Sequence, residues 1–265
     1  MRSAHFFGLI TNIWSLLEAL MIIRIKSGNT NCYLLFREST KKSVLIDAGV
    51  SLDHTFLERL QANGYLSQIA LVILTHGHYD HVGHAAMLQN RFHIPVAIHR
   101  NELERVTQGI MDFPPAKGFI SNTFRKSTMS GMEKSTYQKF VPDIVLDGSR
   151  ILSSFPEIEI LHLPGHTKGS IGIIFEDSLF AGDLVMNMPV PSKSWFAENF
   201  SELQQSIERI SNLRLKRVYP GHGKSFSGQW INHLCPVHGS MRQRFYRKPA
   251  LIRNLQRRTH TVLSI

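Results

Sequence analysis

Short apolar runs typical of β-strands fall into two groups along the chain. The first group has strand patterns at residues 22–26, 32–36, 44–46, 69–74 and 95–98. The second group has them at residues 158–163, 171–175, 179–181 and 217–219. The runs alternate between apolar and polar residues or are wholly apolar, and turn residues such as Gly and Asn separate them. The run at 69–74 is wholly apolar, which is typical of a strand covered on both faces.

Helical patterns follow each group of strands. We expect helices at residues 53–64, 82–92 and 200–212, and a short one from residue 101. Asp53 and Ser201 stand at the positions of N-caps, and Gly64 stands where a helix would stop. Two groups of strands, each with its own helices, predict an α/β fold in which two sheets pack face to face with helices outside.

The two ends of the chain depart from this pattern. Residues 1–20 contain an apolar stretch that Asn12 and Glu18 interrupt, without a small-residue cleavage site, so a weak signal peptide and a functional start at Met21 are both open. Residues 227–265 carry many basic side chains and are interpreted as a C-terminal tail. The folded domain is therefore expected at residues 21–226.

A third unusual segment lies inside the domain. Residues 109–143 contain Pro114 and Pro115, and glycines, serines and basic residues are scattered along the segment. Loops of this length without structure of their own are uncommon unless they are functional. We interpret the segment as an insertion that either shapes the substrate pocket with Phe113, Phe119 and Phe124 or packs as a surface loop.

Charge and composition narrow the partners. The formal net charge is +10, but the last 25 residues hold seven Arg and Lys and no acid, so the rest of the chain carries only +3. A near-neutral body argues against nucleic acid as a partner. No apolar run approaches the roughly 20 residues of a membrane span. We expect a cytoplasmic protein that acts on a small molecule, with secretion as the alternative.

The candidate chemistry begins directly after the apolar run at 69–74. Residues 75–81 read Thr-His-Gly-His-Tyr-Asp-His, with four ligand-type side chains at His76, His78, Asp80 and His81. If the strand continued, His76, His78 and Asp80 would share one face, and a loop could bring His81 round. Imidazole and carboxylate groups are the ligands of catalytic zinc and similar metals.

Three later positions fit the same site. His166, Asp183 and His222 each follow a glycine just beyond a predicted strand. One such residue alone is more often an ordinary turn residue. Three in series, each beside a residue that lets the backbone turn sharply, favour a set of ligands.

These motifs resemble the metallo-β-lactamase superfamily. Its His-x-His-x-Asp-His motif is matched by residues 76–81, and its later ligands by His166, Asp183 and His222. Residues 31–34 and 45–49 are similar to its opening strands, so the resemblance covers residues 21–226. It implies an αββα sandwich of two mixed sheets, with the metals in the cleft between the sheet edges.

The resemblance also implies a division of the ligands. One metal would be held by His76, His78 and His166, and a second by Asp80, His81 and His222, with Asp183 between them. Two Zn²⁺ are expected, with Mn²⁺ and Fe²⁺ as alternatives. Two such cations lower the pKa of a shared water, and the resulting hydroxide attacks an ester-type carbonyl. Asp80 and Asp183 would be the catalytic carboxylates.

Three more residues are candidates on weaker grounds. Asp47 resembles the acid that fixes a ligand imidazole by accepting its other N–H, although a strand-end turn residue is the alternative. His84 stands where many relatives have glycine, and either packs at a helix start or reaches the site. Lys224 follows His222 and either meets a substrate carboxylate or is simply exposed.

The ligand set limits the substrate. Asp183 argues against a true β-lactamase, because those relatives generally lack this aspartate. Glyoxalase II-like thioesterases and acyl-homoserine lactonases both keep all seven ligands. Only 43 residues follow His222, too few for the glutathione-binding helical domain of glyoxalase II. We expect a hydrolase of lactones, including acyl-homoserine lactones, or of thioesters.

Two alternatives remain open. A phosphodiesterase or nuclease of the superfamily would use the same ligands. Binding nucleic acid would call for a basic surface, whereas the chain outside its last 25 residues is near neutral. A mononuclear iron persulfide dioxygenase belongs to another class of enzyme with the same fold. It uses a reduced ligand set around one iron, whereas all seven ligands are present here.

Overall fold

The computed structural model describes residues 20–37, 41–116, 136–235 and 261–264. Most of the N-terminal extension and of the basic tail therefore lies outside the described residues, as do Phe119 and Phe124. Among the described helices, none combines the length and the hydropathy needed to cross a membrane.

The first sheet is built from seven of the described strands. Its order is β15 (Thr261–Ser264), β1 (Leu20–Ser27), β2 (Thr30–Arg37), β3 (Lys42–Ile46), β4 (Ile69–Ile73), β5 (Val96–His99) and β6 (Ile144–Leu146). The strands from β1 to β3 are antiparallel, whereas β3 to β6 run parallel. β15 lies within residues 227–265, which were expected to form a tail, and pairs in parallel with β1.

The second sheet contains six of the described strands. Its order is β14 (Phe226–Ser227), β13 (Arg217–Pro220), β10 (Ser178–Gly182), β9 (Ile171–Phe175), β8 (Phe155–His162) and β7 (Arg150–Leu152). A separate hairpin joins β11 (Val185–Asn187) to β12 (Pro191–Lys193). β9 is antiparallel to both β8 and β10, and β10 is parallel to β13. β8, β10 and β13 therefore end at the same edge of the sheet.

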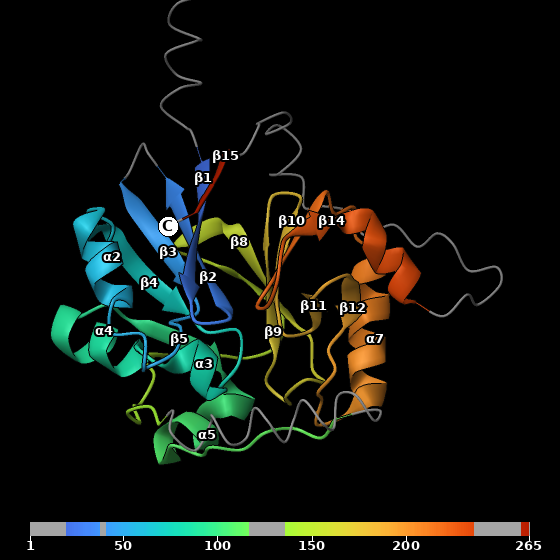
Figure 1. The fold of residues 1–265 in the computed structure, drawn as a ribbon, viewed down its shortest axis with the longest axis horizontal. Coiled ribbons are helices and arrows are strands. Elements are labelled where there is room, and N and C mark those ends of the chain that lie inside the picture. The colour runs from blue at the N-terminus through green and yellow to red at the C-terminus, as the bar shows by residue number, and fades with distance from the viewer. Residues whose placement is uncertain (1–19, 38–40, 117–135, 236–260, 265) are drawn as a thin grey trace, which may run out of the picture.

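Helices cover the outer face of each sheet (Figure 1). On the first sheet these are α2 (Phe56–Ala62), α3 (Tyr79–Val82), α4 (Ala85–Phe92) and α5 (Leu103–Gln108). On the second sheet, α7 (Phe200–Ser211) lies alongside the 3₁₀ helix Gly228–Leu234. Two further 3₁₀ helices, Leu66–Gln68 and Arg100–Glu102, lie in connections.

Buried apolar side chains form three layers that match this arrangement. The middle layer joins the facing sides of the two sheets, for example Ile46 and Ile73 from the first with Ile173 and Phe180 from the second. The outer layers pack the other sheet faces against helices. Alternating side chains explain this, because each strand sends successive residues to opposite faces. The predicted sandwich of two mixed sheets with outer helices is confirmed.

Some local expectations were wrong. The helix expected at 82–92 begins only at Ala85, as α4, because the N–H groups of Gly83 and His84 donate to the carbonyls of Gly49 and Ala48 and separate it from α3. The predicted cap of α7, Ser201, is not the cap. Asn199 takes that role, with its side-chain oxygen accepting from the N–H groups of Ser201 and Glu202.

The described flanks of the 109–143 segment pack on the body. Phe113 makes an edge-on contact with Phe196, with ring centroids 4.8 Å apart. The N–H of Ala197 donates to the carbonyl of Pro115 over 3.1 Å. On the other flank, the hydroxyl of Tyr137 donates to the carbonyl of Arg105. One flank of the segment is thus anchored beside residues 196–197, close in sequence to the hairpin β11–β12, and the other is anchored on α5.

Candidate metal centre

The ligand run lies at the carboxyl end of β4. β4 ends at Ile73, so His76 and His78 occupy a loop, and Asp80 and His81 belong to the single turn α3. The expectation that a continuing strand would align three of these residues was therefore wrong. The loop and the helical turn after it direct the four side chains inward. Within the turn, Asp80 and His81 point in directions about 100° apart, as successive helical residues do.

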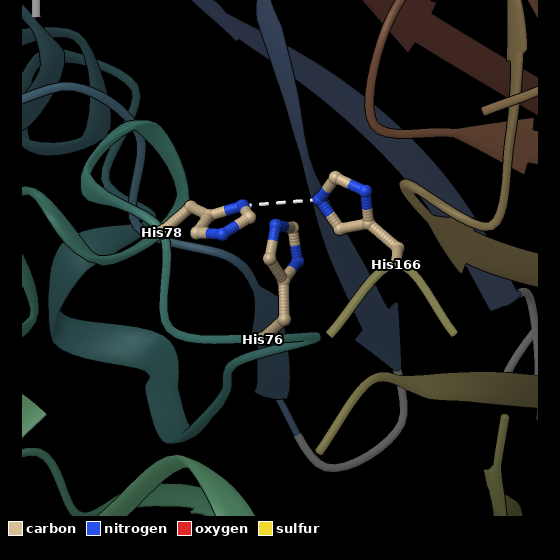
Figure 2. Close-up of side chains that lie close together, drawn as sticks. All are labelled: His76, His78 and His166. Atoms are coloured by element: carbon tan, nitrogen blue, oxygen red, sulfur yellow. Dashed lines mark hydrogen bonds between the residues drawn. The ribbon is translucent and has the colours of Figure 1, made fainter. Parts of the chain in front are cut away.

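Three histidines from two loops form the first cluster, and Figure 2 shows their rings pointing toward one another. His76 and His78 come from the loop after β4, and His166 from the loop after β8. The Nε2 atom of His166 lies 3.0 Å from Nδ1 of His78. One nitrogen from each of the three rings lies within 4.8 Å of the others. All three side chains are buried.

A second cluster lies beside the first. It consists of Asp80 and His81 from α3 and His222, which follows β13. The Oδ2 atom of Asp80 is 3.6 Å from Nε2 of His81 and 3.3 Å from Nε2 of His222. The distances suit three ligands that face one ion rather than a hydrogen-bonded triad, which would have shorter contacts.

Asp183 connects the two clusters. It follows β10 directly, and its Oδ2 atom lies 3.6 Å from Nε2 of His166 and 3.2 Å from Nε2 of His222. Its Oδ1 atom lies 3.4 Å from Nε2 of His81. One carboxylate therefore reaches a histidine of each cluster.

The same edge of the second sheet supplies three of these residues. β8, β10 and β13 run in one direction, and His166, Asp183 and His222 follow their carboxyl ends. The N–H of Ile171 at the start of β9 donates to the carbonyl of Thr75 over 2.9 Å. This bond joins the second sheet to the loop of the first, so both sheets contribute to one site.

Comparison with known proteins shows the family of the chain. A sequence profile described as "Metallo-beta-lactamase superfamily" matches residues 25–222, which is well over half of the chain. The chain belongs to the metallo-beta-lactamase superfamily. The match spans both sheets and both clusters.

Individual relatives share most of the chain. It is 31% identical over 201 residues to the probable metallo-hydrolase MJ0888 of Methanocaldococcus jannaschii, covering 74% of this chain and 88% of that one. It is 27% identical over 228 residues to the acyl-coenzyme A thioesterase MBLAC2 of Bos taurus, covering 79% of each. Among solved structures, the BLEG-1 B3 metallo-beta-lactamase has the same fold, with a TM-score of 0.63 at 24% identity, covering 80% of this chain and 97% of that one.

The Nδ1 atoms of four candidate ligand histidines, which point away from the centre of the site, have defined partners. The Oδ2 atom of Asp47 lies 2.8 Å from Nδ1 of His81 and also accepts the hydroxyl proton of Thr75 over 2.9 Å. Because that proton is committed, the Thr75 oxygen accepts from Nδ1 of His76, 3.0 Å away. Asp47 thus orients one imidazole directly and one through Thr75, with Nε2 of each toward the interior.

Two backbone carbonyls orient other rings. Nδ1 of His166 lies 2.8 Å from the carbonyl oxygen of Phe196, and Nδ1 of His222 lies 3.0 Å from that of Asn29. Since a carbonyl only accepts, each Nδ1 carries a proton, and Nε2 is the nitrogen that would bind a metal. Both Nε2 atoms face Asp183.

Sequence reasoning missed Thr30. Its hydroxyl, at the start of β2, donates to Oδ2 of Asp80 over 2.9 Å, and the side chain is buried. Thr30 stands 50 positions before Asp80, and a threonine after a turn is ordinary in a strand. Only the packing of β2 against α3 brings the two together, so no local pattern could have found it.

Burial and neighbouring charge set the protonation of the first cluster. Burial lowers the pKa of His76, and the imidazoles of His81 and His78 lower it further. Burial likewise lowers the pKa of His78 and of His166. These rings are therefore neutral at pH 7, the form in which an imidazole binds a metal.

The second cluster is dominated by carboxylates. Burial opposes a charge on His81 and on His222, but nearby aspartates outweigh it. Asp80 and Asp47 raise the pKa of His81, and Asp183 raises that of His222 to about 10. The pocket therefore favours positive charge at its centre, which a metal cation would supply.

Several inward atoms accept or donate no hydrogen bond within the described residues. They are Nε2 of His76, Nε2 of His81 and Oδ1 of Asp183, all buried. A buried polar atom without a partner costs about 1–3 kcal/mol. Three of them converging on one space, from residues that could hold an ion, fit a metal site.

Two candidate substrate contacts lie elsewhere. His84 is the N-cap residue of α4, is buried, and stacks on Phe56 with ring centroids 5.0 Å apart. It packs in the layer between α2 and α4, as one of the two expectations had it. Lys224 is exposed, and its carbonyl accepts from the side chain of Asn187 over 2.9 Å.

Proposed function

We propose that this protein is a binuclear metal-dependent hydrolase that cleaves an ester-type carbonyl, with thioesters as the first candidate substrates. The observation that carries the proposal is the pair of linked clusters, with Asp183 reaching His166 in one and His222 in the other. Membership in the superfamily supports hydrolytic chemistry.

The proposed ligand assignment follows the two clusters. His76, His78 and His166 would hold one metal, Asp80, His81 and His222 a second, and Asp183 would contact both. A relative of the same fold, TTHA1623, has been solved in a di-iron-bound form, at 25% identity and a TM-score of 0.56 over 78% of this chain. Zinc is the first expectation for this chain, and iron and manganese are the alternatives, because imidazole and carboxylate ligands accept all three.

The chain's own residues would prepare this site for hydrolysis. When bound, two such cations lower the pKa of water and polarise a carbonyl oxygen. Asp47 holds His81 with its Nε2 atom inward, and Thr30 donates to Asp80 and so restricts its rotation. Ligands that are fixed in advance need no rearrangement during the reaction.

Thioesters are placed before lactones because of one relative. The acyl-coenzyme A thioesterase MBLAC2 is similar over 79% of this chain. A thioester and a lactone present the same electrophilic carbonyl, so the metal clusters alone do not separate them. Phe113, on a described flank of the 109–143 segment, contacts Phe196, whose carbonyl accepts from His166, and this supports the segment as the candidate determinant of the choice.

A substrate panel tests the proposal. Protein with measured metal content would be assayed on acyl-coenzyme A thioesters, S-lactoylglutathione, acyl-homoserine lactones, aryl esters, phosphodiesters and a cephalosporin. We expect two metals per chain and turnover of a thioester or lactone. One iron per chain with persulfide-dependent oxygen consumption would overturn the hydrolase in favour of a dioxygenase.

Ligand substitutions provide the matched test. His78→Ala and Asp183→Ala should each lower metal content and abolish turnover, because each removes an inward-facing group. His233→Ala and Asp147→Asn change exposed residues of the same types and should alter neither. Full rate and full metal content in either ligand variant would refute the assignment.

A further inference from the structure

Glu102 is a buried acid that the proposed chemistry does not use. It is 0% exposed and lies where the 3₁₀ helix Arg100–Glu102 meets α5. It belongs to none of the candidate metal clusters. A carboxylate in such a place needs hydrogen bonds and a countercharge, so its partners show what it holds.

The two oxygens of Glu102 bind two different loops. Oε2 accepts the N–H of Gly77 over 3.0 Å, and Oε1 accepts the N–H of Gly169 over 2.9 Å. Gly77 lies between His76 and His78, and Gly169 lies three residues after His166. One carboxylate therefore joins the backbones that carry all three histidines of the first cluster.

Both loops pack directly against this side chain. A Cβ on Gly77 would lie 2.7 Å from Oε2 of Glu102, and a Cβ on Gly169 would lie 2.5 Å from Cγ of Glu102. Real Cβ atoms do not approach that closely, so glycine at both positions is what lets the loops reach the carboxylate.

Arg105 supplies the countercharge and extends the contact. Its Nη1 donates to Oε2 of Glu102 over 2.6 Å, and its Nη2 donates to Glu198 over 2.6 Å and to Asp112 over 2.7 Å. Glu198 in turn accepts the N–H of Lys168 over 2.8 Å. The guanidinium is thus committed to three carboxylates, which argues against its binding an anionic substrate.

We propose that Glu102 is a positioning residue that sets the spacing of His76 and His78 against His166, and so controls the metal affinity of the first cluster. The inference rests on the metal assignment proposed above. Within the described chain, the hydrogen bonds of Glu102 go to Gly77, Gly169 and Arg105, and none goes to the loop of His222 or to Asp183. Its loss should therefore weaken one metal site and spare the other.

Glu102→Gln tests this with little change of shape. An amide can accept from only one of the two glycine N–H groups and turns a donor toward the other, so the loops should part. Cobalt-loaded protein would be titrated with a chelator, and the two metal-release steps followed by absorbance and by metal analysis. We expect the metal affinity measured in one step to fall roughly 10- to 100-fold, which is typical when a residue that orients a metal ligand is lost, and the affinity in the other step to stay within about twofold.

The control is Glu104→Gln, which removes the same charge from an exposed position on α5. It should leave both release steps unchanged. Excess metal should restore the rate of Glu102→Gln, which a general loss of folding would not allow. If Glu102→Gln fails to fold, Gly169→Ala displaces the His166 loop from Glu102 and should weaken the same step.

Two results would overturn the inference. One is that neither metal-release step changes in Glu102→Gln and Gly169→Ala, and the other is that both steps weaken equally. These results are independent of the substrate panel. Wild-type protein that binds two metals but cleaves no substrate would refute the proposed hydrolase and leave this positioning role standing. Wild-type protein that binds one metal would refute the assignment on which both rest.

Discussion

At the scale of single residues, the site depends on groups that do not face a metal themselves. Asp47, Thr75 and two backbone carbonyls hold the outer nitrogens of four histidines. Each of these contacts fixes the orientation of a ring, because an acceptor at Nδ1 leaves Nε2 to face the interior. Asp47 at the end of a predicted strand and Thr75 next to the motif are visible in the sequence, but the carbonyls of Asn29 and Phe196 are not, since every residue has one.

Thr30→Val tests this scale. Valine keeps the shape of threonine but removes the hydroxyl that donates to Asp80. A hydrogen bond to a charged group contributes about 1.5–3 kcal/mol, so kcat/KM on the substrate found in the panel should fall roughly 10- to 100-fold. Thr30→Ser keeps the donor and should retain most of the rate. Equal rates for Thr30→Val and wild type would show that Asp80 needs no such support.

At the scale of elements, local periodicity predicted most helices and strands but not their ends. The run at 69–74 was correctly predicted as a buried strand, but the strand does not continue through residues 76–80, the condition under which three ligands would have shared one face. The short strands β6, β7, β11, β12 and β14 were missed, because two or three residues do not establish a period. β6 pairs with the distant strand β5, whereas β7, β11, β12 and β14 pair with strands that are near in sequence, so it is the pairing rather than a period that makes them strands.

The cap of α7 provides a test at this scale. Asn199→Ala removes the oxygen that accepts from two backbone N–H groups, and it should lower the free energy of unfolding by about 1 kcal/mol. Ser201→Ala should change it by less than about half as much, since Ser201 is exposed inside the first turn. Urea denaturation of both variants measures the difference. A larger loss for Ser201→Ala would restore the sequence-based choice of cap.

At the scale of the whole molecule, the candidate centre lies where the two sheets meet. His76, His78, Asp80 and His81 come from the first sheet's side, and His166, Asp183 and His222 follow strands of the second. A metal held by residues of both clusters would therefore connect the halves of the sandwich. Binding to the folded state alone stabilises that state in proportion to the logarithm of metal concentration.

Metal removal should accordingly lower the melting temperature. A metal at a thousand times its Kd contributes about 4 kcal/mol, which corresponds to roughly 8–16 °C for a chain of this size. Thermal unfolding with and without a chelator, with metal content measured in parallel, gives the value. Asp183→Ala should show a smaller shift, because it has less metal to lose. Loss of all metal without any shift would show that the ions do not connect the sheets.

The sequence by itself determined the fold class and the members of the candidate site. Strand and helix periods are local, and ligand-type residues after predicted strands are visible as motifs at residues 76–81, His166, Asp183 and His222. Only the tertiary structure decided how these residues are held. Thr30 reaches Asp80 across 50 positions, and Glu102 joins Gly77 to Gly169 across 92. Such contacts arise from sheet pairing and packing between distant segments, which leave no periodic trace along the chain.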